Sequence, residues 1–281
     1  MQSVEKSRGL SQRRVCQALG FDRSSIRYQP NPARHERDQA LTERLRRLAQ
    51  QHPRFGYRRM KAMLGRQAQS EEKHNHKRVQ RLWQAAQLSL PRRRPRKRRS
   101  RPEHRVVEQA TGPNQIWCYD FVHDTCANGA ALKMLTIEDE FTRESLALEV
   151  GASIPTVRVI AVLERLFAER GVPEGIRSDN GPEFVAQAIK NWLEQQQVQT
   201  HYIEPASPWQ NGIAESFNGK LRDECLSREW FRNRREAATL VACYQRYYNE
   251  ERPHSSLNYQ TPLEFRQAYE AAQRASNAGN S

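Results

Sequence analysis

Three acidic residues in the second half of the chain lie where an acid is hard to explain by structure alone. Asp120 interrupts the apolar and aromatic run Ile116–Val122, and a carboxylate buried in a strand is costly unless it is paired or binds metal. Asp179 follows a short apolar segment and precedes Asn-Gly-Pro, at a carboxyl end where α/β folds place function. Glu215 follows Gln-Asn-Gly at the start of a predicted helix. An aspartate placed like Asp179 more often forms a turn, and a glutamate placed like Glu215 can simply be solvated. The prediction of a site therefore depends on the three acids together.

The spacing of these acids favours one shared site. Thirty-five residues separate Asp179 from Glu215, and they hold a predicted helix, strand and loop, so the chain can return a helix beside the strand end. Carboxylate oxygens select Mg²⁺ or Mn²⁺ over zinc, and a three-carboxylate cup can hold two such ions about 3.5–4 Å apart. One ion would activate the attacking oxygen and the other would stabilise the leaving oxygen. We therefore predict that Asp120, Asp179 and Glu215 are catalytic and bind two Mg²⁺ or Mn²⁺ ions.

The helix that carries Glu215 has a polar face. Asn211, Glu215, Asn218 and Arg222 follow one another at intervals of four, three and four residues, which places them on one side of a helix. Apolar residues, among them Phe217, occupy the other side. We expect this helix to pack on the core and to present its polar face toward the site.

The elements that must position these acids alternate between strand and helix periodicity. Three strands are predicted as an antiparallel meander, followed by helix, strand, helix, strand and further long helices. The predicted ranges are strands 115–122, 132–138, 145–150, 175–178 and 198–203 and a helix from about 155 to 170, with a second helical stripe over 184–193. This order predicts an α/β domain of the RNase H-like class, with a mixed five-stranded sheet and flanking helices.

The charge is divided unequally between the two halves of the chain. Residues 1–105 hold 29 Lys or Arg and 8 Asp or Glu, whereas residues 106–281 hold 17 and 24. A basic half of this strength points to nucleic acid, because each neutralised phosphate releases a counterion.

No run approaches the roughly 18 apolar residues of a spanning helix, and the start of the chain lacks a signal-peptide pattern. Five scattered cysteines without a Cys-x-x-Cys pair argue against a disulfide framework or a structural zinc site. We expect a cytoplasmic protein.

The basic half divides into small helical units and a linker. Residues 1–30 contain a helix-turn-helix-like pattern over 11–28, with Ser11 as the expected first cap and Gly20 in the turn. Residues 31–90 are predicted to form a second helical DNA-binding module. The alternative for the first segment is an ordinary helical hairpin, and the alternative for the second is a solvated charged face. Residues 91–105 hold nine Lys or Arg and three prolines, which predicts an extended linker that follows DNA. We place the catalytic domain at 106–270 and a flexible tail at 271–281.

Six stretches of the chain resemble one known family. They are HPRFGYRRM, IWCYDFV, EDEFTRESLALEV, IRSDNGPEF, PWQNGIAESFNGKLRDECL and YNEERPHSSLNYQTP, and they span roughly residues 50–263. Together they are similar to the DDE transposases of bacterial insertion sequences, in particular the IS-three group, whose catalytic core is shared with retroviral integrases. The resemblance implies that Asp120, Asp179 and Glu215 form the metal-binding triad, and that Arg222 stands for the family's basic residue seven positions after the glutamate. It also implies cleavage at element ends that leaves a 3′-hydroxyl, and direct attack of that hydroxyl on target DNA.

DNA contacts are expected from basic and polar residues in each unit. They are Arg23, Arg27, Arg58, Arg59, Arg93, Arg96, Lys97, Arg98, Gln210, Asn211, Lys220 and Arg222. The expected partners are terminal inverted repeats and target DNA, a second copy of the chain on DNA, and an upstream-frame product that the family typically supplies by fusion. Two alternatives stay open at this point. One is an RNase H-like nuclease that only hydrolyses, and the other is a DNA-binding repressor with an inactive core.

Overall fold

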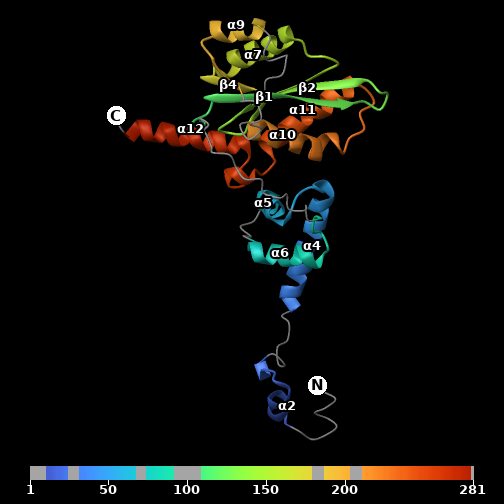
Figure 1. Ribbon diagram of the computed structural model, residues 1–281. Helices are drawn as coiled ribbons and strands as arrows, with labels where there is room; N and C mark the ends of the chain where they lie inside the picture. The colour runs from blue at the N-terminus through green and yellow to red at the C-terminus, as the bar shows by residue number, and fades with distance from the viewer. Residues whose placement is uncertain are drawn as a thin grey trace, which may run out of the picture.

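A five-stranded mixed sheet forms the centre of the second half of the chain (Figure 1). The computed structural model describes residues 11–24, 32–67, 74–91, 109–178, 187–202 and 211–279. The strands are β1 (Ile116–Thr125), β2 (Ala131–Asp139), β3 (Ser145–Gly151), β4 (Gly175–Ser178) and β5 (Gln199–Tyr202). They lie in the order β3-β2-β1-β4-β5, with β1, β2 and β3 antiparallel to one another and β4 and β5 parallel to β1. The predicted meander and RNase H-like fold are confirmed.

Helices cover both faces of this sheet. On one face lie α7 (Thr156–Arg170) and α9 (Gln187–Gln195), and on the other α10 (Gly212–Leu221) and α11 (Arg234–Glu250). A π-helical turn, η2 (Arg222–Leu226), extends α10, and η3 (Ser255–Leu257) with α12 (Pro262–Gly279) completes the described chain. No helix in these ranges combines the length and the apolar character that crossing a bilayer would demand.

The alternation of β1 determines which side Asp120 faces. Trp117 and Tyr119 are buried in the core against α7 and α9, whereas Val122 is buried against α10 and α11. Side chains two residues apart share a face of a strand, so Asp120 lies on the same side as Val122. The strand therefore directs its acid toward α10.

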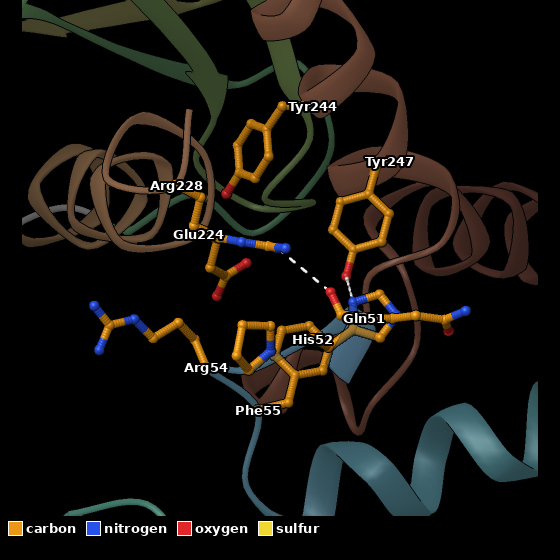
Figure 2. A pocket seen from close by; sticks show the side chains of 9 residues that line it. Gln51, His52, Arg54, Phe55, Glu224, Arg228, Tyr244 and Tyr247 are labelled. Atoms are coloured by element: carbon orange, nitrogen blue, oxygen red, sulfur yellow. Dashed lines mark hydrogen bonds between the residues drawn. The ribbon is translucent and has the colours of Figure 1, made fainter. Parts of the chain in front are cut away.

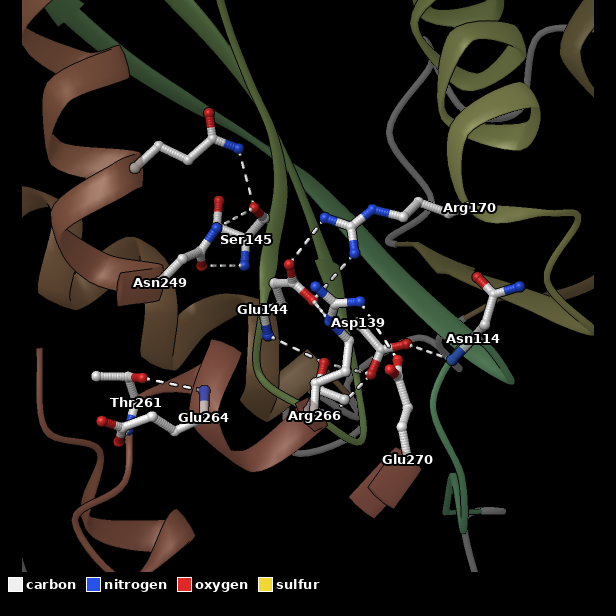
Figure 3. Close-up of polar contacts among 12 residues, drawn as sticks. Asn114, Asp139, Glu144, Ser145, Arg170, Asn249, Thr261, Glu264, Arg266 and Glu270 are labelled. Carbon is white, nitrogen blue, oxygen red and sulfur yellow. Dashed lines mark hydrogen bonds and ion pairs between the residues drawn. The ribbon is translucent and has the colours of Figure 1, made fainter. Parts of the chain in front are cut away.

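The acids at the end of the β2–β3 hairpin have structural roles. The carboxylate of Asp139 accepts hydrogen bonds from the backbone N–H groups of Thr142 and Asn114, both at 2.7 Å. Glu144 forms ion pairs with Arg170 at 2.8 Å and with Arg266 of α12 at 2.9 Å (Figure 3). Because these acids close a turn and attach α12 to the sheet, burial of an acid alone does not mark the site.

A separate helical module precedes the sheet domain. It contains α4 (Pro32–Gln51), α5 (Tyr57–Gln67) and α6 (His76–Ala85), which share a core with Leu45, Leu64 and Val79 at its centre. In Figure 1, α5 lies on the side of the module that faces the sheet domain. The predicted second helical unit is thus a folded body with its own core.

The first helical segment begins as the sequence suggests. Helix α2 (Gln12–Leu19) ends at Gly20, whose φ of 67° is the left-handed conformation that favours glycine. Ser11 occupies the N-cap position, but its side chain makes no capping hydrogen bond, in contrast to the expectation. The described residues of this segment end at residue 24, so most of the second predicted helix lies outside them and the helix-turn-helix pattern over 11–28 stays a prediction. The same holds for the linker and the exact domain boundaries.

Candidate active site

Asp120 is tied to helix α10 by a direct hydrogen bond. Its Oδ2 accepts from the side-chain amide of Asn218 at 2.7 Å, and its Oδ1 accepts from the backbone N–H of Phe121 at 2.7 Å. Asn218 is 5% exposed, and the neighbouring Phe217 packs into the core below the sheet. The amide thus fixes the orientation of the carboxylate relative to α10.

Glu215 lies one helical turn before Asn218 on α10. Three residues correspond to about 4.5 Å along a helix axis, so Glu215 is close to the position where α10 meets Asp120. Its side chain is exposed and lines a groove. Asp179 directly follows Ser178, the last residue of β4, and β4 pairs in parallel with β1. Asp179 itself lies outside the described residues.

The donor set of this region suits a hard divalent cation. Asp120 and Glu215 offer oxygen ligands, which match Mg²⁺ or Mn²⁺. A carboxylate has about four lone-pair positions, so metal ligation is compatible with the hydrogen bonds that orient Asp120. Among the described residues no group of three His, Cys, Asp or Glu side chains is assembled for a metal, and Asp179 is not among those residues.

The groove beside Glu215 is built from two parts of the chain. Its cavity volume is about 830 Å³. One wall comes from α10 and η2, and the other from the helical module and the segment after α6. The lining residues are Arg54, Arg59, Leu90, Pro91, Glu215, Ser216, Gly219, Lys220, Arg222, Asp223 and Glu224. Two of the basic residues predicted from the sequence, Lys220 and Arg222, therefore line the same groove as Glu215.

Lys220 is held in place by the C-terminal signature. Its Nζ donates to Ser216 Oγ at 3.0 Å and lies 3.2 Å from His254 Nε2. Because an ammonium only donates, Nε2 must accept, and Nδ1–H of the ring then donates to Ser256 Oγ at 2.9 Å. Burial lowers the pKa of His254 to about 2, helped by the charge of Lys220, so the ring is neutral. Burial lowers the pKa of Lys220 to about 8, which leaves it mostly cationic at neutral pH.

Glu138 is a second carboxyl group on the sheet face that bears Asp120. It pairs with Cys118 across the β1–β2 ladder, two residues from Asp120 along the strand. Its side chain is buried, and its Oε1 has no hydrogen-bond partner within the described part of the chain. Burial raises its pKa well above the usual range, and the nearby Lys220 opposes that shift.

A cluster of two arginines and one glutamate connects the module to the core. Arg252 donates to both carboxylate oxygens of Glu224, each at 2.6 Å, while Arg59 of α5 lies 3.7 Å from the same group. Burial lowers the pKa of Arg59, as does the charge of Arg252. The ring of Phe55 lies under both guanidinium groups, at 5.2 Å from Arg59 and 5.5 Å from Arg252. Two cations thus share one carboxylate, so Glu224 compensates the charge of Arg59 only in part.

The predicted DNA contacts fall in different environments. Arg222 and Arg58 are exposed, although Arg58 is not among the groove residues, and Arg23 is exposed near the start of the chain. Asn211 and Asn218 are buried, so the polar face expected on α10 is divided, with Glu215 and Arg222 outside and the two amides inside. Gln210, Arg27, Arg93, Arg96, Lys97 and Arg98 lie outside the described residues.

Two contributors to this region were not among the predicted site residues. His254 and Glu224 enter the groove or its support only through the folded chain. Arg54 belongs to the same basic HPRFGYRRM motif as the predicted contacts Arg58 and Arg59, and it lines the groove. The Pro-His-Ser-Ser-Leu signature was visible in the sequence without any indication of its contacts.

Known families match both parts of the chain. Residues 110–208 and 196–262 match families described as integrase core domain, and residues 36–96 match an HTH-like domain family. The sheet domain and the helical module are therefore each recognised separately.

Relatives along the whole chain come from bacterial insertion elements. An uncharacterized 39.2 kDa protein of insertion element IS476 from Xanthomonas euvesicatoria is 40% identical over 96% of this chain and 76% of its own. An uncharacterized 31.7 kDa protein of IS407 from Burkholderia multivorans is 39% identical over 94% of each chain. Transposase InsD of insertion element IS2 from Escherichia coli is 30% identical over 83% of this chain and 80% of its own.

The fold is shared with a viral assembly. A chain of the simian T-cell lymphotropic virus intasome superposes with a TM-score of 0.50 and 17% identity, over 69% of this chain and 67% of that one. Sequence and fold lead to the same conclusion: the chain belongs to the insertion-element transposases with an integrase core, in the IS-three group whose motifs it carries.

Proposed function

We propose that this transposase cleaves DNA at the ends of its element and joins the resulting 3′-hydroxyl to target DNA, with Asp120, Asp179 and Glu215 as catalytic metal ligands. The observation that supports this most is the Asn218–Asp120 hydrogen bond, which fixes α10 against the centre of the sheet. Glu215 lies one helical turn from Asn218, the residue that bonds Asp120, and it lines the groove that also contains Lys220 and Arg222. Such an arrangement serves phosphoryl transfer, where catalysis depends on positioning and charge neutralisation.

The chemistry consists of two phosphoryl transfers. In cleavage, a water oxygen bonds to phosphorus while the bond to the 3′ oxygen breaks, and that oxygen leaves as the 3′-hydroxyl after gaining a proton. In joining, this hydroxyl loses its proton and attacks a target phosphorus, whose own 3′ oxygen is released. Two Mg²⁺ or Mn²⁺ ions would polarise the phosphate oxygens and stabilise the charge that develops on the attacking and leaving oxygens.

The residues of the chain supply orientation for these transfers. Asp120 is kept in one orientation by Asn218, and Glu215, on the preceding turn of α10, lines the groove. Lys220 and Arg222, on the same helix and its extension, line the groove as well and would bind phosphate oxygens of the DNA. His254 accepts from Lys220 and holds its ammonium at the groove.

A strand-transfer assay tests this function. DNA that carries candidate terminal repeats of the element would be incubated with the full chain, target DNA and Mg²⁺. Joined products are the expected result. Cleavage without joining would instead indicate a nuclease that only hydrolyses, and specific DNA binding without either reaction would indicate a repressor with an inactive core.

A further inference from the structure

The groove beside Glu215 has one wall from each of two folded bodies. Arg54 and Arg59 come from the helical module, whereas Lys220 and Arg222 come from α10 and its extension. A ligand in this groove would therefore touch the module and the core at once. The family match of residues 36–96 as an HTH-like domain assigns no such position relative to the integrase core.

The charge of the groove suits a chain of phosphates. Glu224 is engaged on both oxygens by Arg252, so Arg59 is only partly compensated by it. Arg54 and Arg222 are exposed, and Lys220 lines the same groove. The groove also contains the acids Glu215, Asp223 and Glu224, of which Glu215 is proposed as a metal ligand and Glu224 is held by Arg252. Four cations along one open channel match a polyanionic strand better than a single small anion.

Direct contacts hold the module in this position. The ring of His52 stacks on Tyr247 with centroids 5.6 Å apart, and the tyrosine hydroxyl lies 3.0 Å from Nδ1 of His52 (Figure 2). Arg228 donates to the backbone carbonyl of Gln51 at 3.4 Å in the same view. These contacts surround a cavity of about 210 Å³, which Tyr244 also lines.

A second attachment lies at the other end of α5. Arg66 donates to Glu264 of α12 at 2.7 Å and to the backbone carbonyl of Tyr259 at 3.2 Å. Glu264 also accepts from the backbone N–H of Thr261 at 2.9 Å, so the acid is oriented by α12 itself. Helix α5 is thus fixed at both ends, by the contacts around His52 and by Arg66.

The first attachment, around His52, connects two sequence signatures. His52, Phe55 and Arg59 belong to HPRFGYRRM, whereas Tyr247, Arg252 and His254 fall in or beside YNEERPHSSLNYQTP. Each signature supplies one side of the junction between the module and the core. The C-terminal signature therefore has a structural role: it contacts the helical module and it hydrogen-bonds Lys220.

We propose that the module and α10 form one composite groove in cis that grips the DNA strand bearing the reactive 3′ end, with Arg54 on the module side and Lys220 and Arg222 on the core side. This rests on the proposed function for the identity of the strand. The helical module then acts in the reaction itself, as a wall of the active site, and not only as a distant recognition domain.

Site-specific cross-linking tests the composite groove. Arg54→Cys and Arg58→Cys would each be made in the full chain with Cys243→Ser, because Cys243 is the exposed native cysteine among the described residues. Both arginines are exposed and four residues apart, but only Arg54 lines the groove, so Arg58 is the matched control. The DNA would carry a thiol-reactive tether on single phosphates at successive distances from the 3′ end, and Glu215→Gln would prevent turnover.

We expect the Arg54→Cys variant to cross-link to end-proximal phosphates about tenfold more than the Arg58→Cys variant does, because a groove-bound strand raises the local concentration of the tether at position 54. Equal yields from the two variants, links from Arg54→Cys only to remote phosphates, or no link from Arg54→Cys would overturn the composite groove. Strand joining by the parent chain is measured in parallel. Joining without the end-proximal pattern leaves the proposed function intact, whereas that pattern without joining supports the groove and contradicts the function.

Discussion

At the scale of single residues, the environment of each acid separates the candidate ligands from the structural ones. Asp139, Glu140 and Glu144 are buried acids at the β2–β3 turn, but each is engaged by turn N–H groups or by an arginine. Asp120 instead accepts from an amide side chain of the helix that carries Glu215. An amide orients a carboxylate without neutralising it, which preserves the charge that a metal needs.

Removal of any one catalytic carboxylate charge should abolish both reactions. We expect Asp120→Asn, Asp179→Asn and Glu215→Gln to abolish cleavage and joining in Mg²⁺ and to leave DNA binding and the fold nearly unchanged, because the amide keeps the side-chain shape. Products resolved on denaturing gels would measure this. Asp124→Asn is the matched control, since Asp124 lies on the same strand and accepts from its own following N–H, as Asp120 does. A triad variant with near-native joining would remove that residue from the site.

The buried His254 gives the stability a defined pH dependence. Its folded pKa of about 2 lies below the ordinary value of 6.5, so acid protonates the unfolded state first. The free energy of unfolding should fall as the pH drops below 6.5, by roughly 1.4 kcal/mol per pH unit from this group at most. Urea unfolding of the parent and of His254→Gln across this range isolates the contribution. His76→Gln, an exposed histidine on α6, should keep the parental slope; an unchanged slope in His254→Gln would contradict the prediction.

At the scale of elements, the position of α5 depends on contacts that join segments nearly two hundred residues apart. Arg66 and Glu264 belong to α5 and α12, whereas His52 directly follows α4 and Tyr247 lies near the end of α11. Such contacts fix one element against another and have little effect on the helices themselves. Changes at these positions should therefore alter docking while the secondary structure is maintained.

A double-mutant cycle on Arg66 and Glu264 tests the docking contact. Glu264→Gln removes the charge but can still accept from the N–H of Thr261, so α12 keeps its cap. We expect Arg66→Ala and Glu264→Gln to couple by on the order of 1 kcal/mol in urea unfolding of the full chain, because the pair is only partly shielded from solvent. Both single changes should also reduce strand joining severalfold. Glu236→Gln is the control, because it breaks the Arg232–Glu236 ion pair, which lies within the core domain, and it should leave strand joining unchanged. Additive effects of Arg66→Ala and Glu264→Gln on the free energy of unfolding would show that the contact does not contribute.

At the scale of the whole molecule, the unequal charge of the two halves suggests a division of labour. Residues 1–105 carry 29 basic and 8 acidic residues, and residues 106–281 carry 17 and 24. The groove shows that the two halves also meet, through Arg54 and Arg59. Most of the affinity for DNA should therefore come from the first half of the chain. The groove at the junction of the two halves should position the reactive end of the DNA.

Deletion of residues 1–105 should remove most of the DNA affinity and flatten the dependence of log K on log salt, because fewer phosphates are then neutralised. Titrations at several salt concentrations would measure both quantities. Since the deletion exposes the face of Tyr247 that receives the module, thermal unfolding of the fragment is needed as a control for folding. A folded fragment with the full-length salt slope would show that the basic half is not the docking surface.

Strand transfer by this polypeptide should be slower than by an in-frame fusion to an upstream-frame product. Joining two element ends requires at least two active sites held together, and the sequence contains no sustained heptad pattern to pair two copies. Without such a segment the second end must be captured from solution, at a much lower effective concentration. Rates at nanomolar protein compare the two forms directly. Equal rates would show that the polypeptide is sufficient by itself.

Several features were determined by the sequence alone. Local periodicity located every described strand to within three residues at each end, because alternating burial and turn residues act over a few neighbours. The motif-level resemblance to insertion-sequence transposases also depended on the sequence only, and the relatives confirm it. The triad assignment rests on spacing and resemblance and stays a prediction.

Other features were decided only by the tertiary structure. The expected polar face of α10 was divided because Asn218 bonds Asp120 of the sheet and Asn211 is also buried, whereas Glu215 is exposed. Helical spacing cannot distinguish an inward amide from an outward acid. The support of Lys220 by His254, thirty-four residues away, is equally invisible to a local pattern. The composite groove depends on how two folded bodies pack, and that packing is fixed by long-range contacts such as Arg66–Glu264 rather than by the propensity of any segment.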